Sequence, residues 1–444
     1  MIDIDISKKD IDIYIQNNEI ENTIENIIDI IRKKKLDFPY KKYFIKSSDY
    51  LYTNLKKYNI EPVYNKPYKL KNIIDQTGQF FNIFHIKYND KYIYISNNSN
   101  NYDEINVIAD HFTEDARIKS IGYMEKISPY ECWNNDECVK KIIKYAIMNF
   151  GYINVISLRE SIYKTITEAR QGTPTSYLVL YNFFNAKHIL DGASAWGDRL
   201  ISALAYRKTK TYVGIDPNLD LFNGYEKILK KFMKIKNIFM TDSEKEYDMV
   251  KRMNEKGIKK SIYKLIENDV IKKLETFSTK KSKKIILINS PFEKIKLSNI
   301  YKFDLCILSP APFEGEIYGN PDGQSIVNYK NLDEWFINYM LSSVYIMYRK
   351  LKTNGHIIIT ILDRPNQNYK IVELLNLSIN YICEKLIYEG VIGWEGSKQK
   401  ITPWFVWKKK KSDEQIINDK INQAKKLLIQ YYPDFVDKIN KKFK

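Results

Sequence analysis

One segment of the chain, residues 188–200 (HILDGASAWGDRL), has the residue types expected of a loop that binds a small polar ligand. An apolar run ends in Asp191, small residues follow, and a helical pattern begins at Asp198. Small residues let the backbone approach a ligand closely, and the first turn of a helix favours a carboxylate. Gly192 and Gly197 are too far apart for the phosphate-binding pattern G-x-G-x-x-G. We therefore expect a ligand loop between a strand and a helix, and not a phosphate loop of that type.

A second acid follows the next apolar run. Asp216 ends the segment 212–216 (YVGID), 25 residues after Asp191. A carboxylate at the end of a second strand can accept hydrogen bonds from both hydroxyls of a ribose. A generic α/β strand followed by turn residues would explain either segment alone. Two such segments in register, separated by a helix, favour a ligand that contains a nucleoside.

The elements around these loops alternate between short apolar strands and helices from about residue 165 onward. We expect a long helix at 332–351 to end at Asn354-Gly355, because glycine commonly follows the last turn of a helix. Such alternation implies a parallel, doubly wound sheet, whose ligands bind beyond the carboxyl ends of the strands. The expected strands are 188–190, 211–215, 285–288, 304–308 and 356–362, and a further helix is expected at 198–206.

These segments resemble the class I S-adenosylmethionine (SAM) dependent methyltransferases over about residues 165–408. The resemblance implies an α/β fold, a Rossmann-like class I methyltransferase sheet preceded by an N-terminal α+β module, with SAM as the cofactor. The loop after the first strand would line the methionine half of SAM, the acid after the second strand would hold the ribose, and residues 288–293 (INSPFE) would contact the adenine. The implied cofactor-binding residues are Asp191, Gly192, Ala193, Ser194, Gly197, Asp198, Asp216, Ser290 and Phe292.

Residues 309–313 (SPAPF) resemble motif IV of the amino-methyltransferases, [Asp/Asn/Ser]-Pro-Pro-[Tyr/Phe/Trp], particularly those of large DNA viruses and phages. That family methylates adenine N6 or cytosine N4. The resemblance implies that Ser309 and Pro310 orient the amine and that Phe313 stacks on a base taken out of its helix. Ala311 replaces the second proline of the motif, and the aromatic residue comes one position late. Either the loop bulges and Phe313 stacks, or the catalytic platform is lost.

Three functions are compatible with these motifs. The first is SAM-dependent methylation of a base amine in nucleic acid, which needs in-line positioning and no strong general base. The second is a non-catalytic subunit that binds nucleic acid or a partner, and the third is methylation of RNA or of a cap structure. A formal net charge of +17 favours a polyanionic partner, although an AT-rich genome would enrich lysine without selection for binding.

The cysteines and histidines predict no metal site. Four of each are scattered along the chain without the spacing of a zinc site, and so few cysteines favour a reducing, intracellular setting. The viral resemblance adds the expectation of a cytoplasmic location. No membrane segment is expected either, because no apolar run approaches the ~18 residues of a spanning helix.

Four regions outside the motifs have open interpretations. Residues 1–150, with a hairpin signal at 80–95, are expected to set substrate choice or to bind a protein partner, because they lie outside the methyltransferase domain at 165–408. Residues 409–444 form a basic amphipathic helix, either packed on its own domain or acting as an arm on nucleic acid. The lysine-rich stretch 218–284 is either an insertion facing nucleic acid or a solvated surface. Residues 167–172 (TEARQG) either contact SAM or mark a helix-to-loop boundary.

Overall fold

The computed structural model describes residues 4–17, 20–59, 92–95, 102–233, 239–241, 272–275, 283–297, 302–311, 313, 315–319, 323–361, 370–395, 401–411 and 414–444. Within these ranges the largest element is a ten-stranded sheet with the order β2-β11-β12-β10-β9-β4-β5-β8-β7-β6. Its central strands are β4 (His188–Asp191), β5 (Thr211–Asp216), β8 (Lys284–Asn289), β9 (Phe303–Leu308) and β10 (Leu351–Ile359). Its outer strands are β2 (Tyr92–Ile95), β6 (Phe239–Thr241), β7 (Lys272–Glu275), β11 (Leu386–Glu395) and β12 (Ile401–Lys409).

The five central strands are parallel, and β12 is inserted antiparallel between β10 and β11. The chain runs outward from β4 through β5 to β8, and then returns to β9 on the other side of β4. The strand order therefore reverses between β4 and β9, which is the point at which such sheets bind their ligands. This is a Rossmann-like α/β sheet, as predicted.

Alternating residues of each strand pack against helices on opposite faces of the sheet, because successive side chains of a strand point to opposite sides. Leu190 packs with the helices of one face and Ile189 with those of the other. The first face is covered by α15 (Leu332–Glu334), the π-helical turns at Trp335–Leu341, α16 (Ser342–Lys350) and α17 (Ile371–Ile382). The second is covered by α10 (Pro174–Phe183), α11 (Asp198–Ala205) and α12 (Leu221–Met233).

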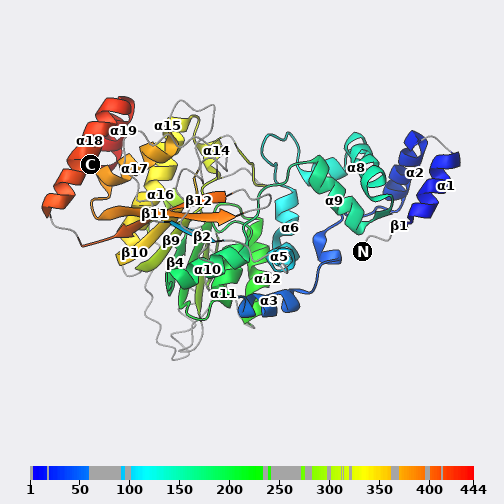
Figure 1. Ribbon diagram of the computed structural model, residues 1–444, viewed down its shortest axis with the longest axis horizontal. Helices are drawn as coiled ribbons and strands as arrows, with labels where there is room; N and C mark the ends of the chain where they lie inside the picture. The colour runs from blue at the N-terminus through cyan, green and yellow to red at the C-terminus, as the bar shows by residue number, and fades with distance from the viewer. Residues whose placement is uncertain are drawn as a thin grey trace.

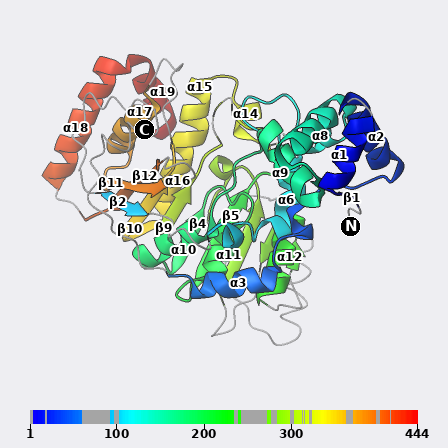
Figure 2. The same cartoon turned by 45° about the vertical axis from the view of Figure 1, so that its right-hand side comes forward.

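The N-terminal residues are divided between two cores. The helices α1 (Lys8–Asn17), α2 (Ile20–Lys33), α7 (Pro129–Trp133), α8 (Asp136–Phe150) and α9 (Val155–Thr165) form an N-terminal lobe at one end of the molecule, together with the short pair β1 (Asp5–Ile6) and β3 (Ile153–Asn154) (Figure 1). In contrast, α3 (Ser48–Lys57), α5 (Tyr102–Asn106) and α6 (Asp110–Ile118) pack with α10, α11 and α12 on the sheet (Figure 2). Part of the segment 1–150 thus completes the core of the sheet domain.

The structure differs from the sequence expectations at the end of one helix and in one expected hairpin. The helix expected at 332–351 ends at Lys350 and not at Asn354-Gly355, because Leu351 already pairs with Phe303 as the start of β10. Asn354 instead has a φ of 66°, within an irregularity of β10 between Leu351 and His356. Of the hairpin expected at 80–95, only β2 is described, and it pairs in parallel with β11; the first run lies outside the described residues, as does most of the lysine-rich stretch 218–284.

The cysteines fall into two groups. Cys132 and Cys138 form a disulfide that joins α7 to the first turn of α8, whereas Cys306 and Cys383 are buried thiols. The sequence did not predict this bond, because the two cysteines lie six positions apart and form no C-x-x-C unit. Across the described ranges, no helix is both long and apolar enough to cross a membrane.

The C-terminal segment forms two helices and not one. Pro433 begins α19 (Pro433–Phe443) after α18 (Glu414–Tyr431), because proline fits the first turn of a helix but not its interior. Both helices lie at the end of the molecule away from the N-terminal lobe (Figure 1). Leu428 and Phe435 are buried in the core that covers the first face of the sheet. The segment therefore packs on its own domain.

The two sides of α18 offer a matched test of this packing. Leu428 is completely buried, whereas Ile416 on the same helix is 60% exposed. We expect Leu428→Ala to lower the free energy of unfolding by about 2–5 kcal/mol through the lost contacts and the cavity. We expect Ile416→Ala to change it by less than about 0.5 kcal/mol. Urea denaturation measures both values, and equal losses would contradict the observed packing.

Candidate active site

Four predicted loops meet at the carboxyl edge of the sheet, because they follow neighbouring parallel strands. Backbone hydrogen bonds join them directly. The Gly192 N–H donates to the carbonyl of Ile307 (2.9 Å), which connects the loop after β4 to β9. The Ser194 N–H donates to the backbone carbonyl of Ile215 (2.9 Å), and the Ser290 N–H donates to the backbone carbonyl of Asp216 (3.2 Å). The structure therefore brings together the residues that the sequence placed at the ends of four strands.

Asp191 lies at the centre of this arrangement and is completely buried. Its carboxylate accepts hydrogen bonds from the Arg199 guanidinium (2.7 Å), the Tyr212 hydroxyl (2.6 Å) and the backbone N–H of Ala193 (3.2 Å). Arg199 also donates to the carbonyl of Ala193, and its guanidinium lies over the ring of Tyr177 at 5.2 Å. In this conformation, Asp191 holds the loop and the start of α11 in place and presents no carboxylate oxygen to solvent.

The loop after β4 has a tightly constrained backbone. Ala195 and Gly197 have φ angles of 49° and 90°, in the left-handed region that glycine adopts without strain. A Cβ atom on Gly192 would lie 2.8 Å from the ring of Phe292 and 2.9 Å from the methyl group of Met347. Phe292 is only 2% exposed and thus supports the loop from the core side. Glycine at position 192 allows this close packing.

Asp216 is the acid with remaining hydrogen-bonding capacity. It accepts from the backbone N–H groups of Ala195 (2.8 Å) and Asn218 (3.0 Å), which uses two of about four acceptor positions of a carboxylate. Burial raises its pKa to about 7. The side-chain amide nitrogen of Asn218 is also buried, and among the described residues it has no hydrogen-bond acceptor. A carboxylate and an unsatisfied donor side by side suit a ligand with hydroxyl groups and an acceptor atom.

Residues 167–172 lie against the loop after β4. The amide of Gln171 donates to the carboxylate of Asp198 (3.2 Å), whose pKa burial raises to about 7. The indole N–H of Trp196 donates to the carbonyl of Arg170 (2.8 Å). The segment follows the end of α9 at Thr165, as the interpretation of a helix-to-loop boundary predicts, and these contacts place it beside the loop after β4.

The loop after β9 contains the predicted catalytic residues. Ser309 and Pro310 are partly exposed directly beyond the strand. Phe313 is partly buried, and its ring centroid lies 6.2 Å from that of Trp335. Pro312 lies outside the described residues. In this conformation, the ring of Phe313 packs against the helical segment that follows the loop.

A buried charged cluster adjoins the site and was not predicted from the sequence. Glu168 accepts hydrogen bonds from Arg117 and Arg159, and these arginines also bond Asp110 (2.8 Å) and Glu114 (3.1 Å). All five side chains are at least 93% buried. The cluster joins α6 and α9 to the segment 167–172 beside the ligand loop. No local sequence pattern predicts this cluster, because its members are spread over residues 110–168.

The loop after β9 is fastened to the same region. Glu316 accepts from the backbone N–H of Arg170 (3.2 Å) and from the Tyr318 hydroxyl (2.7 Å). Ile317 pairs with Ile121, which follows α6. Residues from the first 170 positions of the chain therefore hold the segment that follows the predicted catalytic loop.

Neither a family model nor a curated protein matches the amino-acid sequence. A class I SAM-dependent methyltransferase of Listeria monocytogenes is similar in structure, with a TM-score of 0.33 and 12% identity over 61% of this chain and 78% of that one. Trm1 of Pyrococcus horikoshii, solved with S-adenosyl-L-methionine, has a TM-score of 0.31 and 12% identity over 58% of each chain. The N-methyltransferase NodS of Bradyrhizobium japonicum has a TM-score of 0.28 and 10% identity, over 54% and 94%. All three scores are low, and the fold is identified by the strand order of the sheet.

The buried pair of Asp191 and Arg199 should dominate the stability of this edge. We expect Arg199→Leu to lower the free energy of unfolding by about 3–5 kcal/mol, because it leaves the Asp191 carboxylate buried without its cation. Arg207→Leu removes an exposed arginine just beyond α11 and should change stability by less than about 0.5 kcal/mol. Urea denaturation compares the two variants, and a loss below about 1 kcal/mol for Arg199→Leu would show that the pair contributes little.

Proposed function

We propose that this chain is a SAM-dependent methyltransferase that acts on nucleic acid, on an exocyclic amine of a base (adenine N6 or cytosine N4). The observation that carries the proposal is the meeting of Asp216, the loop 191–198 and Ser309-Pro310 at the point where the strand order reverses. Ligands of open α/β sheets bind at this point. The net charge of +17 supports a polyanionic substrate.

The chain's own groups fit the parts of SAM. Asp216 has free acceptor positions for the two ribose hydroxyls, and the buried amide of Asn218 beside it offers a donor. The loop 192–197 and the first turn of α11 lie where the methionine carboxylate would be favoured by the helix dipole. Ser290 follows β8 next to Asp216 and would face the adenine. Asp191 is enclosed by Arg199 and Tyr212, so it would hold the loop in position without contacting SAM.

SAM, when bound, supplies an electrophilic methyl group, and the remaining chemistry is positioning. The hydroxyl of Ser309 and the carbonyl of Pro310 would accept hydrogen bonds from the amine, which aims the nitrogen lone pair at the cofactor. Phe313 would stack on the base after turning away from Trp335. No strong base is required at the amine, because its proton can leave to water after the transfer.

A non-catalytic binding subunit is the second candidate function. It is favoured by Ala311 in place of the second proline and by the packing of Phe313 on Trp335. RNA, including a cap structure, is an alternative substrate to DNA, because the site would contact a base that both nucleic acids share. The N-terminal residues would select the substrate, because they hold the segments on either side of the site.

Transfer of a labelled methyl group from SAM to a mixed panel of DNA and RNA tests the proposal. We expect label on nucleic acid, and we expect digestion to locate it on a base amine. Phe313→Leu should lower kcat/KM about five- to a hundredfold through the loss of 1–3 kcal/mol of base stacking, with an unchanged affinity for SAM. Tyr163→Leu, which removes an exposed aromatic ring far from the loop after β9, should leave kcat/KM unchanged. Bound SAM without transfer to any substrate would support the non-catalytic function.

The affinity for SAM should depend on pH through Asp216. Because the raised pKa of about 7 disfavours the carboxylate, the unbound protein should lose stability as the pH rises from about 4 to about 7. Ribose hydroxyls bind the carboxylate form, so we expect the affinity for SAM to weaken about tenfold from pH 8 to pH 6. Isothermal titration calorimetry of Asp216→Asn should show weaker binding with a flatter pH profile.

Asp198, whose pKa is also about 7, provides the matched control for this pH dependence. We expect Asp198→Asn to keep the pH profile of the wild-type protein, because Asp198 already bonds Gln171 and lies at the start of α11. A flat pH profile in Asp198→Asn and a steep one in Asp216→Asn would contradict the proposal that Asp216 binds the ribose.

A further inference from the structure

The edge of the sheet opposite the candidate active site is rimmed with cations. Lysine precedes or begins the central strands, and β12, which runs the other way, ends in four consecutive lysines at the same edge. We name this surface the lysine edge. Its members are Lys187, Lys210, Lys302, Arg349, Lys352, Lys385, Lys408, Lys409, Lys410 and Lys411.

Hydrogen bonds and strand register make the lysine edge one continuous surface. The backbone N–H of Lys210 donates to Lys187 (2.7 Å), and that of Lys410 donates to Lys385 (2.9 Å). The ammonium of Lys352 and the backbone N–H of Lys187 both bond Asp304, at 2.7 and 3.1 Å. The cations of neighbouring strands therefore follow one another along the edge.

Part of this charge has a structural explanation. Helix C-termini gather at this edge, and their free carbonyls attract cations. Lys302 donates to the carbonyl of Arg349 (2.8 Å), and Lys409 donates to the carbonyls of Tyr348 (2.9 Å) and Leu351 (3.1 Å). These ammonium groups provide hydrogen-bond donors for the carbonyls at the C-terminal end of α16.

Four other cations of the lysine edge have no such role. Lys187, Lys210, Arg349 and Lys411 are exposed, and within the described part of the chain no carbonyl or carboxylate pairs with their side chains. The stability of the fold does not account for these four charges, and their mutual repulsion opposes it. A bound polyanion would offset that repulsion.

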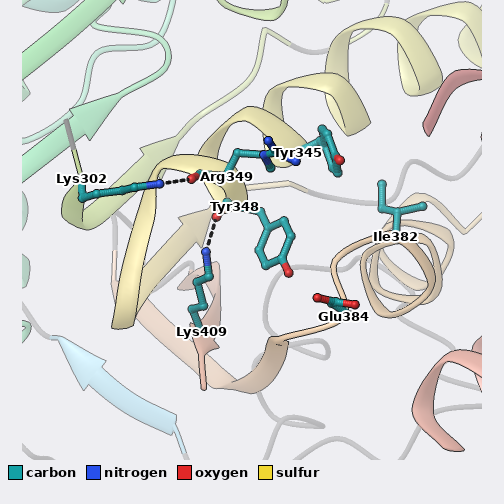
Figure 3. Close-up of a pocket in the computed structure, with 7 residues that line it drawn as sticks. All are labelled: Lys302, Tyr345, Tyr348, Arg349, Ile382, Glu384 and Lys409. Atoms are coloured by element: carbon teal, nitrogen blue, oxygen red, sulfur yellow. Dashed lines mark hydrogen bonds between the residues drawn. The ribbon is translucent and has the colours of Figure 1, made fainter. Parts of the chain in front are cut away.

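A cavity of about 490 Å³ opens in the middle of the lysine edge (Figure 3). Lys302, Arg349 and Lys409 line it together with the rings of Tyr345 and Tyr348, and Glu384 is its one acid. Burial, and after it the charges of Lys302 and Lys385, lower the pKa of Lys409. An anion seated there would be balanced by three cations and flanked by two aromatic rings.

We propose that the lysine edge binds the phosphodiester backbone of a nucleic acid, with one phosphate seated in the cavity between Lys302, Arg349 and Lys409. The inference deepens the proposed function, because it rests on a nucleic-acid substrate. Five spacings of about 4.8 Å separate β5 from β11, so the edge spans about 24 Å, or the rise of about seven base pairs. The strands put about 20 Å between this edge and the active site, so a substrate must follow the protein surface to reach both.

Charge removal from the four unpaired cations tests the inference. The edge variant carries Lys187→Gln, Lys210→Gln, Arg349→Gln and Lys411→Gln, which leave the carbonyl-bonded lysines intact. The control variant carries Lys9→Gln, Lys33→Gln, Lys425→Gln and Lys426→Gln, which remove the same charge from exposed positions elsewhere. A melting temperature no lower than that of the wild-type protein and an unchanged affinity for SAM establish that both variants fold.

Fluorescence anisotropy of 30-base-pair DNA and RNA duplexes at several salt concentrations is the readout. Each lost phosphate contact lowers the slope of log affinity against log salt by about 0.9, so we expect the edge variant to lose about 2–4 in slope and at least tenfold in affinity. We expect the control variant to match the wild-type protein. Equal slopes in the two variants would overturn the inference, as would binding of anionic lipid vesicles in place of nucleic acid.

Methyl transfer separates this inference from the proposed function. A dinucleotide substrate is too short to reach the lysine edge, so the edge variant should methylate it at the wild-type rate. Edge-dependent binding without any methyl transfer would refute the catalytic proposal and keep the inference. Methyl transfer, together with equal duplex affinity in the edge variant and the wild-type protein, would refute the inference and leave the proposed function intact.

Discussion

The buried ion pair between Asp191 and Arg199 is the interaction on which the site depends. It closes the turn from β4 into α11, because Arg199 bonds both the carboxylate and the carbonyl of Ala193. Tyr212 ties the same carboxylate to β5, so a single acid sets the spacing of two strands and a helix. Removing two charges from water costs several kcal/mol per ion, and close hydrogen bonds offset that cost only in one geometry. The loop that would receive SAM is thereby preorganised.

A second buried cluster extends this constraint to the N-terminal part of the chain. Glu168 bonds arginines from α6 and α9, and the residues that follow it reach Asp198 and Glu316. The backbone N–H of Arg170 thus links the cluster to Glu316, 146 residues further along the chain. Substrate selection by the N-terminal residues would act through this connection, since the loops on both sides of the site share it.

The two edges of the sheet have opposite electrostatic character for one reason. Parallel strands with crossover helices place helix N-termini at one edge and helix C-termini at the other. The first edge contains the acid-bounded ligand loops, and the second contains lysines that bond carbonyls of α16. The cations beyond those required by the carbonyls make the second edge a surface for a polyanion. Binding and chemistry would then be divided between the two edges of one sheet.

The sequence by itself determined the elements that depend on short-range patterns. Apolar runs located the five central strands, and the acids at their ends placed Asp191 and Asp216 at one edge, because parallel strands must end together. Only the tertiary structure distinguished the two acids: Arg199 and Tyr212 enclose Asp191, whereas Asp216 keeps free acceptor positions. Tertiary pairing also began β10 at Leu351, and tertiary contacts assembled the cluster around Glu168 and the lysine edge. Such contacts join residues far apart along the chain, and no local periodicity records them.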